Sequence, residues 1–198
     1  AVNMSLGGGR FFSHCDNENP QTDLIELLHS VGIATVIASG NDYFMDAIGG
    51  PACIDRAISV GATNGNAAVA PFSNSADMID LLAPDTNAQP SAQGEGIESS
   101  IPRGRFARYP GTSMATPHVA GALAVLRSAA PSASVDELVE VLASTGLPVR
   151  DARNGLVKPR IAVGKAVEAL GVASGVASDE PAPEPEKPKR RRVNGILI

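Results

Sequence analysis

The sequence predicts an α/β fold with a mainly parallel sheet that is covered by helices on both faces. Three consecutive segments support this prediction: an apolar strand at Ala1–Ser5, an amphipathic helix at Gln21–Ser30, and a continuous apolar, β-branched run at Ile33–Ala38. Strand, helix and buried strand make a βαβ unit, and sheets assembled from such units are parallel and covered on both sides. With 198 residues, the chain is long enough to bury a sizeable core.

Local signals mark the ends of these three segments. The three consecutive glycines of Leu6–Gly9 are expected to end the first strand, because glycine loses much conformational entropy in regular structure. Asp23 with Glu26 resembles a capping pair at the start of the helix, and Gly32 suits its end. The turn residues Ser39–Asn41 end the apolar run.

The rest of the chain predicts two more strands and three more helices. Asn64 and Gly65 mark a turn between the strands, and the polar stretch Pro84–Gly96 predicts an exposed loop. A capping box joins Ser134 to Glu137 ahead of an apolar stripe. The expected strands are Ala57–Val60 and Met78–Leu82, and the expected helices are Thr112–Arg127, Ser134–Leu142 and Ile161–Leu170.

The composition changes abruptly after Ser174. Residues 174–192 contain four prolines among charged side chains, which favours an extended, solvated linker. Residues 193–198 are expected to begin a following segment or domain. The folded body is therefore expected to comprise residues 1–173.

The charge of the chain excludes some classes of partner. Residues 174–198 hold 4 of the 21 acidic and 5 of the 16 basic side chains, so residues 1–173 carry 17 and 11, a net charge of −6. Such an acidic body argues against nucleic acid as the main partner.

No apolar run approaches the ~20 residues that a membrane span needs. The first residues lack the features of a signal peptide, so we expect either a removed presequence or a longer parent protein.

Candidate binding residues follow two of the predicted parallel strands. In open α/β sheets, ligands bind beyond the carboxyl ends of the strands, where Ser5–Gly8 and Ala38–Asn41 lie in this chain. A third segment, Gly111–His118, is a glycine-led turn into a helix with Ser113 in its first turn. Unpaired helical N–H groups and the helix dipole would stabilise an oxyanion that forms beside this hydroxyl. Taken alone, such a serine is also a common helix N-cap. Pro117 lacks a backbone N–H and is expected to distort the first turn.

The string Gly-Thr-Ser-Met-Ala-Thr-Pro-His-Val-Ala-Gly at Gly111–Gly121 resembles the nucleophile segment of the subtilisin-like serine peptidases. The resemblance covers about residues 1–170, with its segments in the order of that family. It implies a three-layer α/β fold with a mainly parallel sheet, of which this chain forms the C-terminal half. The other matching segments are Asn3–Gly8, Ala38–Asn41, Ile58–Ala62, Phe72–Asn74 and Leu82–Pro84.

The resemblance implies a serine endopeptidase, with a polypeptide as substrate, in which Ser113 attacks the scissile carbonyl and forms an acyl-enzyme. Asn41 matches the asparagine of the oxyanion hole, whose amide donates together with the backbone N–H of Ser113. The substrate would add as a strand along one edge and place the side chain before the cut in a pocket with Asp42 at its rim. The edge comprises Ser5, Leu6, Gly7 and Gly8, and the pocket wall comprises Ala38, Ser39, Gly40 and Gly49.

The general base and the orienting acid have no match in this sequence. In the family they precede the strand with which this chain opens, in the order Asp, His, Ser. No histidine here lies in the family's His-Gly-Thr context: His14 has no acidic residue before it, His29 ends the first helix, and His118 matches a position that is not catalytic. We therefore expect the missing N-terminal half of the catalytic domain to supply both residues, and this chain alone to be inactive.

Cys15 and Cys53 are the two cysteines of the chain. Some bacterial members of the resembling family have cysteines in both of these loops, which implies a disulfide and a secreted or otherwise extracytoplasmic protein. Two free, buried thiols are the alternative. No cofactor is evident, and no acidic cluster has the spacing of metal ligands, so calcium enters by family analogy alone.

A catalytically degenerate homologue, which binds peptides along Leu6–Gly8 without cutting them, is the alternative function. Retention of both Ser113 and Asn41 favours the enzyme, because a binding module requires neither residue. An intact Asp and His upstream would decide for the enzyme, and their replacement would decide for the binding module.

Overall fold

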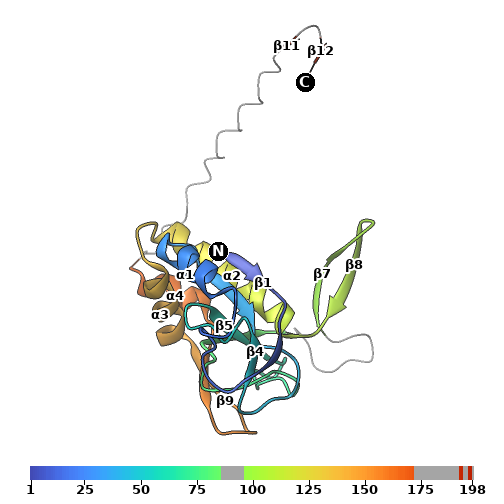
Figure 1. Cartoon of the computed structure of the whole chain (residues 1–198), viewed down its shortest axis with the longest axis vertical. Helices are drawn as coiled ribbons and strands as arrows, with labels where there is room; N and C mark the ends of the chain where they lie inside the picture. Colours follow the sequence, from blue (N-terminus) through green and yellow to red (C-terminus); the bar gives the residue numbers. More distant parts are fainter. Residues whose placement is uncertain (86–95, 172–191, 194–195, 198) are drawn as a thin grey trace.

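The computed structural model describes residues 1–85, 96–171, 192–193 and 196–197. Six strands form its central sheet: β1 Val2–Met4, β3 Thr35–Ala38, β5 Ile58–Thr63, β6 Leu81–Pro84, β9 Leu147–Arg150 and β10 Val157–Arg160. Their order is β1-β3-β5-β6-β10-β9 (Figure 1). Every neighbouring pair is parallel except β9 with β10. The predicted α/β fold with a mainly parallel sheet is therefore confirmed.

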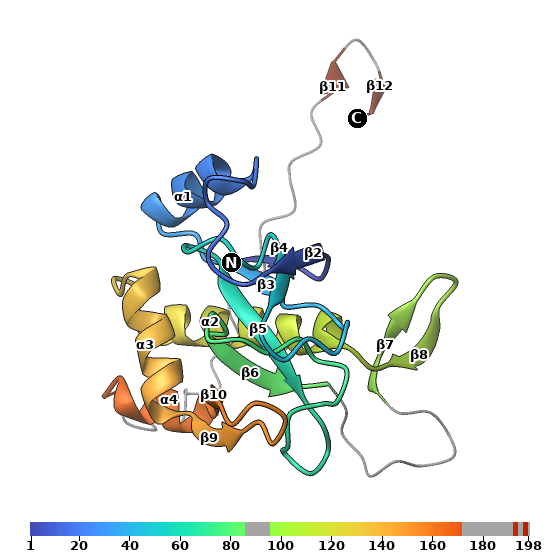
Figure 2. The same ribbon diagram turned by 60° about the horizontal axis from the view of Figure 1, so that its bottom comes forward.

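Helices cover both faces of this sheet. They are α1 Thr22–Ser30, α2 Thr112–Ala129, α3 Val135–Thr145 and α4 Val163–Ala169. Successive residues of a strand point to opposite faces. Val36 accordingly packs in one apolar cluster with α2, α3 and α4, whereas Ile37 packs in a second cluster with Ile25 of α1. α1 lies apart from the other three helices (Figure 2), which gives the expected three layers.

The first strand, β1, ends at Met4, ahead of the glycine segment, as predicted. The expectation that these glycines stay out of regular structure is wrong, because Gly8 and Gly9 begin a second strand. β2, Gly8–Phe11, pairs antiparallel with β4, Ile48–Gly50. The reason is a close approach of the two backbones, because a Cβ on Gly7 would lie 2.9 Å from the carbonyl oxygen of Gly50. The absence of a side chain is therefore what allows the strands to meet.

Two antiparallel hairpins were not predicted. β7, Ile97–Ile101, and β8, Arg105–Tyr109, form a hairpin that projects from the body ahead of α2 in both views (Figures 1 and 2). β9 and β10 form the second hairpin, at the edge of the central sheet. The four strands are rich in polar and charged residues, and so they lack the apolar pattern of a buried strand.

Capping was predicted correctly for α3 and wrongly for α1. Ser134 Oγ accepts from the N–H of Glu137, and the Glu137 carboxylate accepts from the N–H of Ser134, as the capping box requires. In α1, by contrast, Gln21 is the N-cap residue and Asp23 already lies inside the first turn. Asn19 accepts from the N–H of Gln21 and so starts this helix before the expected capping pair.

Several predicted segments lie outside the described residues. They are residues 86–95, which make up most of the expected loop Pro84–Gly96, and residues 174–191 of the expected linker. Farther along, β11, Arg192–Val193, pairs antiparallel with β12, Ile196–Leu197. Among the helices of the described ranges, none is long and apolar enough to cross a membrane.

Candidate active site

The turn into α2 carries Ser113. Gly111 precedes the helix with a φ of +142°, a backbone conformation that favours glycine. Its carbonyl oxygen accepts from the N–H groups of Met114 and Ala115. The N–H of Ser113 has no acceptor in the described part of the chain, and it stands at the N-terminus of an 18-residue helix, where the helix dipole is positive.

Asn41 lies beside this turn and is held there by Thr112. Its Oδ1 accepts from the backbone N–H and from Oγ1 of Thr112, both at 2.9 Å. Because a backbone N–H can only donate, this assignment fixes the amide and leaves Nδ2 free to donate elsewhere. A Cβ on Gly111 would lie 3.7 Å from both Asn41 Nδ2 and Ser113 N. Two unused donors therefore lie on the same side of Gly111, as an oxyanion hole requires.

Ser5 connects the end of β1 to the start of α2. Ser5 Oγ donates to the carbonyl oxygen of Ser113 at 2.7 Å, and Ser113 Oγ donates to the carbonyl oxygen of Ser5 at 3.4 Å. Pro117 permits the first of these bonds, because it lacks the N–H that would otherwise donate to Ser113 O one turn earlier. α2 continues through Pro117 without a break.

The predicted substrate edge and pocket wall come together in space. The N–H of Gly49 donates to Ser39 O at 2.8 Å, and a Cβ on Gly49 would lie 3.3 Å from Gly8 N. The edge is accessible, because a Cβ on Gly8 would meet no described atom within 4 Å and Leu6 is 55% exposed. Ala38 and Ser39 are buried, so these two residues support the wall from behind.

Asn74 is a site residue whose role was not predicted. Its Nδ2 donates to Ser39 O and to the Asp42 carboxylate, and its Oδ1 accepts from the N–H groups of Asp42 and Phe44. Gly40 packs so closely that a Cβ there would collide with the Asn74 amide. Asn74 is buried, and a buried asparagine is rare unless it is fully hydrogen-bonded. In the sequence, the one indication of a site role was that Asn74 ends the matched segment Phe72–Asn74.

None of the three histidines hydrogen-bonds to the nucleophile. Within the described residues, the Ser5 carbonyl is the one hydrogen-bond partner of Ser113 Oγ. His118 lines a cavity of 290 Å³ together with Ser113 but does not bond to it. The histidine contacts are His14 Nδ1 with Cys53 O at 3.2 Å, His29 Nε2 with Asp136 Oδ1 at 2.8 Å, and His118 Nδ1 with Met114 O at 2.8 Å.

Cys15 and Cys53 form a disulfide that closes a separation of 38 positions. Both sulfur-bearing residues are buried. Cys15 follows β2 and Cys53 follows β4, and these two strands pair beside the substrate edge. The disulfide therefore joins the two sides of this antiparallel pair covalently.

The described residues contain no group of three or more His, Cys, Asp or Glu side chains that could hold a metal ion. The pKa of Asp80 is raised by desolvation of its carboxylate, although Ser59 donates to that carboxylate from both N–H and Oγ. Asp80 lies just before β6 and does not contact Ser113. No step of the chemistry below requires a metal from this part of the chain.

A family model described as the subtilase family matches residues 1–171. The chain belongs to the subtilase family. An intracellular serine protease of Paenibacillus polymyxa is 37% identical over 144 residues, and subtilisin E of Bacillus subtilis (strain 168) is 34% identical over 147 residues. These matches cover 70% and 73% of this chain.

Solved structures of subtilases are also similar. A protease of Pseudoalteromonas arctica PAMC 21717 matches 85% of this chain with a TM-score of 0.73 and 32% identity. A cold-adapted subtilisin-like serine proteinase matches 80% of it with a TM-score of 0.65 and 28% identity. The three-layer fold predicted from the sequence is thus that of known subtilases.

The chain spans only part of these relatives. It covers 39% of the P. polymyxa protease, 35% of subtilisin E, and 50% of the P. arctica protease structure. One of these subtilases is named an intracellular protease, so membership of the family does not by itself establish export.

Proposed function

We propose that this chain carries the nucleophile and the oxyanion hole of a serine endopeptidase that cleaves polypeptides through an acyl-enzyme on Ser113. The observation that supports this most strongly is the pair of unused donors beside Gly111. Thr112 holds Oδ1 of Asn41, so Nδ2 of Asn41 and the N–H of Ser113 are both available to one oxyanion. A structural N-cap serine would need no such asparagine.

The first half of the reaction forms the acyl-enzyme. Ser113 Oγ attacks the scissile carbonyl carbon while a general base removes its proton, and the carbonyl oxygen becomes an oxyanion. Asn41 Nδ2 and Ser113 N–H donate to that oxyanion. The C–N bond then breaks, the base returns its proton to the leaving amine, and the acyl group remains on Ser113.

The second half repeats these steps with water. The base removes a proton from a water molecule, which attacks the acyl carbon and forms a second oxyanion at the same donors. Ser113 Oγ leaves and recovers the proton from the base. The peptide acid is released and the free hydroxyl is restored.

Substrate binding uses the open edge beside Ser113. An extended peptide would pair with the backbone of Leu6–Gly8, which follows β1 and includes the first residue of β2. Its side chain before the cut would enter the pocket bounded by Gly40 and Gly49. Asp42, whose carboxylate accepts from Asn74, would lie at the rim.

The base and the orienting acid are proposed to come from sequence upstream of this chain. Ser113 Oγ contacts no histidine in the described residues, and the three histidines bond to other groups. Without an added half domain, the chain would bind peptide but leave it uncut. Export is proposed from the buried Cys15–Cys53 disulfide, since such bonds persist in oxidising compartments.

The test is labelling of the full-length protein with a fluorophosphonate, which reacts with activated serines. The isolated 198-residue chain and a Ser113→Ala variant of the full-length protein are the controls. Labelling of the full-length protein alone, lost in the variant, would support the proposal. Labelling of the isolated chain would show that it contains its own base.

Absence of labelling in a folded full-length protein, free of any inhibitory segment, would favour the catalytically degenerate peptide-binding domain. That protein should then still bind an unlabelled peptide along Leu6–Gly8. The two functions are thus separated by the reactivity of one hydroxyl.

A further inference from the structure

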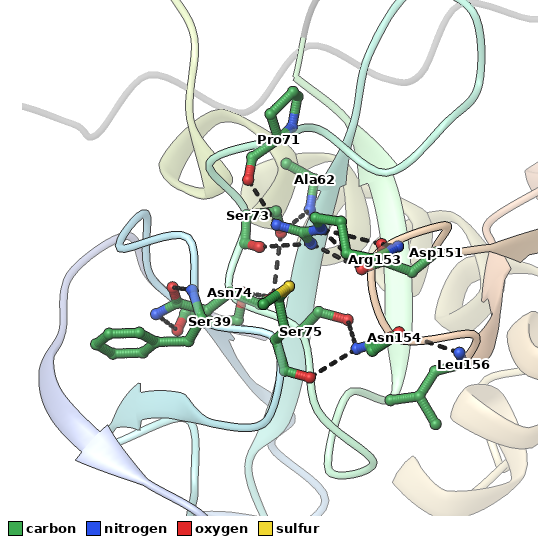
Figure 3. A network of polar contacts seen from close by, with 12 residues as sticks. Ser39, Ala62, Pro71, Ser73, Asn74, Ser75, Asp151, Arg153, Asn154 and Leu156 are labelled. Carbon is green, nitrogen blue, oxygen red and sulfur yellow. Dashed lines mark hydrogen bonds and ion pairs between the residues drawn. The ribbon is translucent and has the colours of Figure 1, made fainter.

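The loop between β9 and β10 reaches the back of the pocket wall. It places Arg153 and Asn154 against residues 71–75, about 80 positions earlier in the chain (Figure 3). Gly155, with a φ of +82°, allows the chain to turn back toward β10. A distant hairpin thus contacts the segment that contains Asn74.

Arg153 binds that segment through its carbonyl oxygens. Nη1 donates to Pro71 O at 2.5 Å and Nη2 donates to Ser73 O at 2.9 Å. Asp151 holds the guanidinium in place, with Nε at 2.9 Å and Nη2 at 2.7 Å from its carboxylate oxygens. The Asp151 side chain is 4% exposed and that of Arg153 is 22% exposed, so this ion pair is largely shielded from water.

Asn154 binds both residues 71–75 and the segment that follows Asn41. Its Nδ2 donates to Met45 O at 2.8 Å and to Ser75 Oγ at 3.0 Å. Its Oδ1 accepts from the N–H of Leu156, which closes the loop. The same short loop therefore holds both residues 71–75 and the segment that follows Asn41.

Residues 71–75 in turn form hydrogen bonds with the segment that follows Asn41 and continues the pocket wall. The N–H of Tyr43 donates to Phe72 O, and the N–H of Ser75 donates to Phe44 O. Asn74, which directly follows the Ser73 carbonyl that Arg153 binds, accepts from the N–H groups of Asp42 and Phe44. Figure 3 shows this sequence of contacts from Arg153 through Ser73 and Asn74 to Ser39.

These contacts suit arginine in particular. Its planar fork can hold two carbonyl oxygens and a carboxylate at once, whereas the ammonium of lysine is a single point charge. The carbonyls of Pro71 and Ser73 are in an irregular segment, where no sheet partner would fix them. A side chain from another element is what sets their position.

We propose that Arg153, supported by Asp151 and Asn154, is a positioning residue that sets the shape of the pocket for the substrate side chain before the cut. This inference rests on the proposed function for the identity of the ligand. Arg153 does not contact Ser113 or Asn41, and so it acts on selectivity through Asn74 rather than on the chemical step. The shape of the pocket wall therefore depends on residues that lie far apart in the sequence.

The experiment compares the full-length protein with its Arg153→Ala, Arg153→Lys and Arg150→Ala variants. Arg150 is the matched control, because it is an exposed arginine on the same hairpin with no bond to residues 71–75. Two p-nitroanilide peptides that differ only in alanine or phenylalanine before the cut report selectivity. Amide hydrogen exchange at Asp42, Tyr43 and Phe44 reports the wall directly, without any need for catalysis.

The expected result is specific to the pocket. Arg153→Ala should reduce the preference between the two peptides by about tenfold, mainly through KM, and accelerate exchange at the three amides by about tenfold. Arg153→Lys should restore part of both properties, and Arg150→Ala should change neither. Fluorophosphonate labelling of Ser113 should stay within about threefold of the native rate, because the small probe does not fill the pocket.

Equal losses for both peptides, or unchanged exchange at the three amides, would overturn the inference. If Arg153→Ala does not fold, Asn154→Ala leaves the Arg153 contacts in place, removes the bonds to Met45, Ser75 and the N–H of Leu156, and should still accelerate exchange at Phe44. If the native protein is not labelled at all, the proposed function fails, and the exchange data alone still decide whether Arg153 sets the wall.

Discussion

The pocket wall and the β7–β8 hairpin are built in opposite ways. Residues 39–46, which continue the pocket wall, are irregular in backbone, as are residues 71–75 that support them. Asn74 joins these two segments, and Arg153 and Asn154 hold them from distant positions in the chain. The hairpin is held by its own backbone pairing, with one exposed ion pair between Glu98 and Arg108. An irregular segment with a defined conformation therefore depends on side chains from distant positions in the chain, whereas a regular hairpin depends on the pairing of its own two strands.

The largest expected effect comes from removing the covalent tie behind the wall. In the double variant Cys15→Ser, Cys53→Ser, the free energy of unfolding should fall by about 4 kcal/mol, because the 38-position loop regains its entropy in the unfolded chain. Urea denaturation with and without a reductant measures this change. Reductant should have no effect on the double variant, and an equal response of both proteins would contradict the prediction.

Substitution of Asn41 should lower the rate of catalysis and leave the fold intact. In subtilisin, itself a member of this family, loss of the oxyanion-hole asparagine lowers kcat by about 10²–10³, and we transfer that magnitude to Asn41→Leu in the full-length protein. KM should change little, because Asn41 Nδ2 acts on the oxyanion. Initial-rate kinetics measure both constants. A loss confined to KM would place Asn41 in ground-state binding instead.

Acid should weaken the ion pair between Asp151 and Arg153 that supports the wall. Burial raises the pKa of Asp151, but hydrogen bonds from Arg153 and Ser75 outweigh it, so the net pKa is below the ordinary value of 3.8. A lowered carboxyl pKa stabilises the folded state above the ordinary value, and that stability is lost as the pH falls through the folded-state pKa. Asp80 contributes in the opposite direction, since burial raises its pKa and its protonation on acidification relieves a cost.

The measurement is the free energy of unfolding between about pH 5 and pH 2 for the native protein and Asp151→Asn. The variant should be less stable at the upper end and should lose less stability on acidification. Asp23→Asn, which changes an exposed carboxylate of α1, is the control and should follow the native curve. Parallel curves for native protein and Asp151→Asn would contradict the prediction.

The smallest effect is expected in the hairpin. Phe106 is 70% exposed, so Phe106→Ser should change the free energy of unfolding by less than about 0.5 kcal/mol. Leu81→Ala, in the buried strand β6, should lower it by about 2–5 kcal/mol in the same assay. A loss for Phe106→Ser comparable with that for Leu81→Ala would show that the hairpin is held by more than its own pairing.

The sequence predicted the parts of the fold that have a strong local pattern. The βαβ unit of β1, α1 and β3 and the capping box of α3 follow from apolar periodicity and short-range polar pairs. The β2–β4 pair was missed because its cause is a close approach between Gly7 and Gly50, 43 positions apart, which no local pattern records. The two hairpins were missed because their strands bury few apolar side chains.

The residues of the candidate site also fall into two groups, those that the sequence predicts and those that it does not. Ser113, Asn41 and the glycines of the substrate edge were found because a linear string resembles a known family. The roles of Asn74 and Arg153 could not be found so, because each acts through bonds to backbone carbonyl or N–H groups elsewhere, and a carbonyl has no sequence signature. Which carbonyls require a donor becomes known only when the strands are in place.

Pro117 has a consequence for how the nucleophile is aligned. Because Pro117 has no N–H to donate to the carbonyl of Ser113, that carbonyl is open to Ser5, at the start of the substrate edge, which donates to it. In the proposed reaction, this bond would tie the helix that carries the attacking hydroxyl to the strand that presents the target peptide.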